Sequence, residues 1–81
     1  MTQDRQGEGS FELKVEKDTS PAEAARMALK QEKRARRFYE ECALVMTDPA
    51  ARKMFEFLAS EEKKHEDLIQ GEIDRSFLAE M

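Results

Sequence analysis

The feature that most constrains the fold of this chain is the break Thr47-Asp48-Pro49, which separates two long segments of helical periodicity. Asp48 suits an N-cap, and Pro49 suits the first position of a helix. The periodicity predicts one helix to about residue 46 and a second from residue 49 to about residue 69, with Gly71 either ending or softening it. Helices joined by so short a turn pack antiparallel, so we expect a hairpin.

The first helix has an equally clear start at Ser20-Pro21, where Glu23 completes a capping box. Residues 1–19 precede this start, and we expect them to form a flexible N-terminal segment. Within it, residues 11–16 alternate apolar and charged side chains, which is a strand pattern. They form either an arm laid on a partner or an extended lead-in. We expect the helical hairpin domain to span residues 20–81.

A hairpin of this size needs support beyond its own core. The chain has 81 residues and buries only about two-thirds or less of its unfolded surface. It has one cysteine, Cys42, so it can form no internal disulfide and no four-Cys metal site. Metal binding and self-association remain as supports. We find no apolar run of about 18 residues and no signal peptide, so we expect no membrane partner and a cytoplasmic location.

The apolar arcs of both helices are wider than one contact needs. In the first, Met27, Phe38, Cys42 and Val45 widen the stripe, and in the second, Met54, Phe57 and Leu68 do so. A stripe of about 100° suffices to face a single neighbour. The surplus predicts a partner, most simply a second copy of the chain. The expected fold class is therefore all-α, a hairpin that dimerises into a four-helix bundle.

Ionisable residues interrupt both apolar stripes. Glu62 and His65 form a Glu-x-x-His pair, so their side chains project from one helical face and can reach the same ion. A charge in an apolar seam is costly unless it is paired or binds a metal. Glu32 interrupts the first stripe, and antiparallel packing about the turn places it level with Glu62. We expect Glu32, Glu62 and His65 to be metal ligands.

Two chains related by a two-fold axis would supply four carboxylates and two imidazoles. That set matches the di-iron or di-manganese sites of ferritin-like four-helix bundles. Carboxylates with one nitrogen per metal suit Fe(II), Fe(III), Mn(II) and, less selectively, Zn(II). We expect a di-iron site, with Mn or Zn as substitutes.

Three segments resemble a rubrerythrin-type ferritin-like half-domain over residues 22–70: Glu32 to Glu40, the Thr47-Asp48-Pro49 turn, and Phe57 to His65. The single hairpin is most similar to the encapsulated ferritins, whose hairpins dimerise and assemble further. The resemblance implies a ferroxidase that oxidises Fe(II) with dioxygen or peroxide between chains, with Glu32, Glu62 and His65 as catalytic metal ligands. Tyr39 either hydrogen-bonds a ligand carboxylate, as the resemblance implies, or is a core tyrosine whose hydroxyl is satisfied elsewhere.

The chain departs from this resemblance in two ways. It lacks the four-Cys rubredoxin domain of rubrerythrin, which puts a self-contained peroxidase in doubt. It stops at Met81 without an obvious tail for docking to an encapsulin shell. We expect that either the protein is not encapsulated or a longer chain was trimmed. An encapsulin shell remains an implied partner and location.

Two other functions compete with the ferroxidase. A non-catalytic helical scaffold or interaction module would need Glu32 and Glu62 paired with cations such as Arg36 or His65. A nucleic-acid binder would use the basic cluster of residues 30–37. That cluster includes Glu32, and the net charge is -4, so we expect a solvated face and no nucleic-acid partner.

Overall fold

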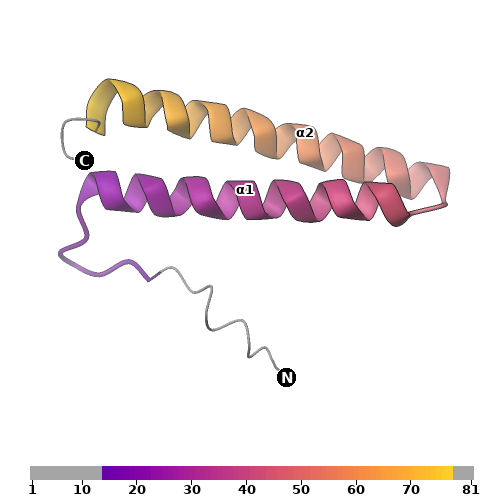
Figure 1. Cartoon of the computed structure of the whole chain (residues 1–81), viewed down its shortest axis with the longest axis horizontal. Coiled ribbons are helices and arrows are strands. Elements are labelled where there is room, and N and C mark those ends of the chain that lie inside the picture. The colour runs from indigo at the N-terminus through magenta and orange to yellow at the C-terminus, as the bar shows by residue number, and fades with distance from the viewer. Residues whose placement is uncertain (1–13, 78–81) are drawn as a thin grey trace.

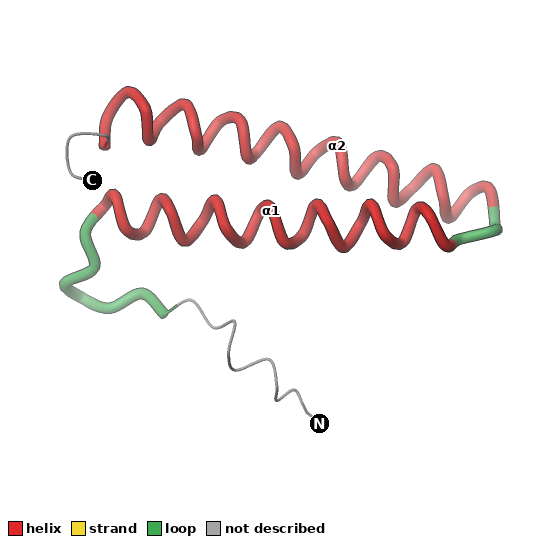
Figure 2. Tube along the Cα trace, in the orientation of Figure 1, coloured by secondary structure: helices red, strands yellow, loops and turns green. Residues whose placement is uncertain are grey.

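The computed structural model describes residues 14–77 and consists of two antiparallel helices lying side by side (Figure 1). Helix α1 spans Pro21–Val45 and helix α2 spans Pro49–Glu72. A π-helical turn, η2, follows at Ile73–Phe77. The described residues contain no strand (Figure 2). The predicted all-helical hairpin is therefore confirmed for this part of the chain.

Both helices begin where the sequence predicts. The Ser20 Oγ accepts a hydrogen bond from the Glu23 N–H at 3.0 Å, and the Glu23 carboxylate accepts one from the Ser20 N–H at 3.2 Å. The Asp48 Oδ2 accepts a hydrogen bond from the Ala51 N–H at 2.8 Å. These contacts satisfy N–H groups that the first turn of a helix leaves without partners. They fix the ends of the three-residue connection, residues 46–48, after which α2 runs back along α1.

Of the two outcomes that the sequence left open at Gly71, an end or a softening of the helix, the structure shows that α2 continues. The helix passes Gly71 without a break and ends at Glu72. The reason is visible at Ile73, which is only 3% exposed and so continues the buried stripe into η2. Packing of this apolar side chain outweighs the weak helical propensity of one glycine.

The N-terminal strand pattern does not produce a strand in residues 14–16, and residues 11–13 lie outside the described part. The segment instead turns just before α1. The Thr19 N–H donates to the Glu16 carbonyl oxygen at 3.1 Å, and the Glu16 N–H donates to the Thr19 Oγ1 at 2.7 Å. The described residues contain no neighbouring strand, so the alternation of apolar and charged side chains alone cannot form the hydrogen bonds of a β-sheet. The roles of an arm or a flexible lead-in stay predictions.

The core between the helices is small. The buried apolar residues are Ala22, Ala43, Ala59 and Ile73, and no large side chain of the described residues is fully buried. At about 100° per residue, several exposed apolar side chains from both helices project to one side of the hairpin. We call this side the apolar face; it consists of Phe38, Val45, Met54, Phe57 and Leu68. Exposed fractions there run from 49% for Met54 to 71% for Val45. Neither helix is long and apolar enough to cross a membrane.

Candidate metal centre

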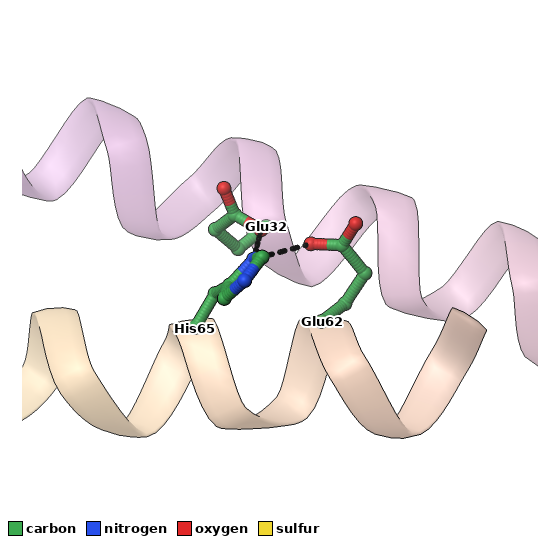
Figure 3. Close-up of side chains that lie close together, drawn as sticks. All are labelled: Glu32, Glu62 and His65. Carbon is green, nitrogen blue, oxygen red and sulfur yellow. Dashed lines mark hydrogen bonds and ion pairs between the residues drawn. The ribbon is translucent and has the colours of Figure 1, made fainter. Parts of the chain in front are cut away.

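Glu32, Glu62 and His65 come together midway along the hairpin (Figure 3). Glu32 extends from α1, while Glu62 and His65 extend from α2 one turn apart. One ligand atom from each residue lies within 4.8 Å of the other two. The predicted convergence of these three side chains is therefore observed, and their spacing would allow them to hold one metal ion.

The imidazole lies between the two carboxylates. His65 Nδ1 is 3.3 Å from Glu32 Oε1, with hydrogen-bond geometry, and 3.4 Å from Glu62 Oε1 (Figure 3). The His65 side chain is 54% exposed, whereas Glu62 is 19% and Glu32 is 27% exposed. The carboxylates thus sit between the helices, and the imidazole forms the open edge of the site.

The two carboxyl groups of the site lie close enough to repel each other when both are ionised. A hydrogen bond shared with the Glu32 carboxyl raises the pKa of Glu62, and burial and repulsion by Glu32 raise it further. The hydrogen bond to Glu32 raises the pKa of His65, although partial burial opposes this. Glu62 Oε1 is buried without a hydrogen-bond partner among the described residues. A bound cation would satisfy this oxygen and offset the repulsion, so the donor set fits a metal.

A buried ion pair beside the site was not predicted. Arg36, which the sequence offered as a partner for Glu32 or Glu62, instead donates from Nε and Nη2 to the two oxygens of Glu66. Its Nη1 donates to Glu40 Oε2 at 2.9 Å. Glu66 and Glu40 raise the pKa of Arg36 above its ordinary value. The sequence signal was available, because Glu66 follows Glu62 by one turn on the same stripe.

Tyr39 lies in an aromatic row next to the site. Its ring stacks on Phe55 with centroids 6.2 Å apart and meets Phe38 at 5.7 Å. Within the described part of the chain its hydroxyl makes no hydrogen bond to Glu32, so a role in orienting a ligand carboxylate stays a prediction. Glu61, the neighbour of Glu62, forms an ion pair with Lys64 at 3.0 Å.

Comparison with known proteins identifies the family. The family model for rubrerythrin matches residues 3–73, which is most of the chain. A search of curated proteins and a search of solved structures each give no match. Rubrerythrin-type proteins are ferritin-like and commonly bind iron or act as oxidoreductases, in agreement with a helical hairpin that brings two glutamates and a histidine together. The chain therefore belongs to the rubrerythrin family.

Proposed function

We propose that this protein is an iron-binding ferroxidase, which oxidises Fe(II) at a di-iron site formed between two subunits. The observation that carries this proposal is the convergence of Glu32, Glu62 and His65 within 4.8 Å. A di-iron carboxylate site in a four-helix bundle needs four carboxylates and two imidazoles, which is twice the set that one chain supplies. Two copies would complete it.

The apolar face supports the same partner. His65 is three residues after Glu62, so its side chain is rotated around α2 toward the side on which Phe57 and Leu68 lie exposed. The imidazole edge of the site therefore borders the apolar face. A second copy docked there by a two-fold axis would cover the exposed aromatic and aliphatic side chains and bring its own three ligands to the first set. The result would be a homodimeric four-helix bundle, or a higher homo-oligomer built from it.

Each residue has a distinct role in this proposal. Glu62, the more buried carboxylate, would bridge the two metals, and Glu32 and His65 would each ligate one. A pair of Fe(II) ions can deliver two electrons together to dioxygen or peroxide. The carboxylates favour the hard Fe(III) product and balance its added charge, while the half-exposed His65 leaves the site open until a partner covers it. Mn(II) or Zn(II) could occupy the same ligands.

The proposal includes a similarity to the encapsulated ferritins, and the single hairpin of the described residues supports it. In those proteins one hairpin per chain dimerises to complete the site. An encapsulin shell is the corresponding partner and location. Its binding can be tested by co-expression with a shell protein and co-purification.

The decisive experiment is native mass spectrometry of the metal-free protein, with and without anaerobic Fe(II), followed by oxygenation while Fe(III) absorbance is recorded. We expect two irons per dimer and rapid oxidation. Glu62→Ala should abolish paired binding, while Glu61→Ala should bind and oxidise iron as the unmodified protein does, since Glu61 pairs with Lys64. Full stoichiometry and rate in Glu62→Ala would contradict the proposal.

One observation favours the alternative of a non-catalytic scaffold. His65 already lies within ion-pair distance of both Glu32 and Glu62, as a purely structural cluster requires. Such a scaffold would have the same mass and the same oligomeric state with and without Fe(II). It should also remain assembled in Glu62→Leu, with higher stability and no loss of any iron-dependent property.

A further inference from the structure

Arg36 and Glu66 form a charged layer next to the metal centre. Arg36 follows Glu32 by four residues on α1, and Glu66 follows Glu62 by four residues on α2. Since four residues make about one turn, the pair lies one turn from the carboxylate ligands on both helices. Arg36 Nε donates to Glu66 Oε2, and Nη2 donates to Oε1 at 3.4 Å. The guanidinium thus contacts both oxygens of a carboxylate across the hairpin.

The stability of the hairpin does not by itself explain this pair. The Glu66 side chain is 5% exposed, and Arg36 is 25% exposed. Desolvation of two charges cancels much of their attraction, so that apolar residues of similar volume are often equally stabilising or more so. A two-point guanidinium–carboxylate contact also fixes the orientation of the two side chains, because the planar guanidinium meets both carboxylate oxygens in only one mutual orientation. Glu40 fixes the fork from a third side at 2.9 Å.

The metal centre needs a fixed alignment of α1 against α2. Glu32 is the one ligand of the three that comes from α1, and its Oε1 lies 3.3 Å from His65 Nδ1. Sliding α1 along α2 by one residue would move Glu32 by about 1.5 Å and break this contact. Without metal, the Glu32 and Glu62 carboxylates also repel each other at this level. The alanine-rich core, with Ala43 and Ala59, offers few interdigitating side chains to resist the slide.

We infer that Arg36 and Glu66 are positioning residues of the metal centre. Their buried two-point ion pair holds α1 and α2 in the register at which Glu32 meets Glu62 and His65. The inference rests on the proposed function only in taking these three residues as metal ligands. In this inference the Arg36–Glu66 pair aligns the metal ligands, which a salt bridge that only stabilises the fold would not do.

The test replaces the pair by apolar residues of similar size, Arg36→Met with Glu66→Met, and uses Co(II) as the probe. The double variant should unfold at an equal or higher temperature than the unmodified protein, since no charge is left buried alone. Its Co(II) affinity should fall about 10- to 100-fold, and the visible spectrum of bound Co(II) should change. The matched control is Lys63→Met with Asp67→Met, an exposed pair at 3.1 Å within α2, which should alter neither property.

A second variant, Arg36→Lys, keeps the charge and removes the two-point contact. It should also weaken Co(II) binding and shift the spectrum, which a role in charge balance alone would not require. Unchanged affinity and spectrum in both variants would overturn the inference while the proposed function stands. Failure of the unmodified protein to bind Co(II), Mn(II) or Fe(II) would overturn the proposed function and this inference together.

Discussion

Replacing Glu62 by glutamine should make the metal-free protein more stable while it destroys the metal site. Glutamine keeps the shape of the side chain and removes one of two carboxylate charges that lie within 4.8 Å. At that separation, two unit charges repel by about 1 kcal/mol in water and about 3.5 kcal/mol at an effective dielectric constant of about 20. The partial exposure of both carboxylates and the nearby imidazole reduce the upper figure. We expect a gain of about 1–2 kcal/mol at pH 7.

The gain should depend on pH with a definite sign. Because the folded protein raises the pKa of Glu62 above its ordinary 4.5, the folded state binds more protons than the unfolded state between the two values. The free energy of unfolding of the unmodified protein therefore falls as the pH rises through the raised pKa. Below about pH 4.5, both states carry a neutral Glu62, and the advantage of Glu62→Gln should vanish. It should reappear as the pH rises.

Thermal unfolding by circular dichroism measures this effect, in the presence of a chelator and at matched protein concentration. A gain of 1–2 kcal/mol corresponds to a rise of roughly 4–16 °C in Tm for a domain of this size. Glu61→Gln is the control, because it removes the adjacent carboxylate, which pairs with Lys64. We expect that variant to change stability by no more than about 0.5 kcal/mol. A Glu62→Gln protein that is no more stable than the original at pH 7, or equally shifted at pH 4, would refute the electrostatic argument.

Three further predictions concern the apolar face, the protonation of the site and the start of α1. Phe57→Glu should shift the protein to monomer in sedimentation velocity, whereas Leu44→Glu, at a more exposed position on the opposite side, should not; equal sedimentation of both variants would exclude this face as the interface. Metal affinity should rise as the pH passes upward through the raised pKa of His65, because a proton competes with the metal for Nδ1. Titrations with Mn(II) at pH 6 and pH 8 measure this change, and equal affinities at the two pH values would contradict ligation by His65. Ser20→Ala should lower stability by about 1 kcal/mol through loss of the capping box, while Ser60→Ala, whose hydroxyl donates to the Phe57 carbonyl, should change it little in the same thermal assay.

The helix starts and the convergence of Glu32, Glu62 and His65 could be predicted from the sequence because local rules decide them. Ser20 and Asp48 act as caps through contacts three residues away, which the sequence shows directly. The position of the turn alone shows which residues of the second helix lie opposite Glu32, because two straight helices run antiparallel from that turn. Helix periodicity and one short connection thus place residues 32 and 65 side by side.

The features that sequence reasoning missed depend on choices between nearly equivalent neighbours. Arg36 has Glu32, Glu40 and Glu66 within reach, and helix periodicity does not decide which of them its guanidinium faces. The sequence left the end of α2 open at Gly71, because that end depends on the burial of Ile73, which outweighs the local signal of one glycine. Helix periodicity puts Tyr39 on the apolar stripe, but it does not show that the tyrosine ring stacks on Phe55 across the hairpin.

The antiparallel path of the chain has a consequence for how the molecule could be rebuilt. The beginning of α1 and the end of α2 lie at the same end of the hairpin (Figure 1). A peptide linker could join the last described residue of one copy to Ser20 of a second, and each attachment point lies at this same end of its own hairpin. Such a tandem chain would replace a concentration-dependent encounter by an intramolecular one with a millimolar effective concentration. The two halves of such a tandem chain could also differ in sequence, so that Glu62 could be changed in one half and kept in the other.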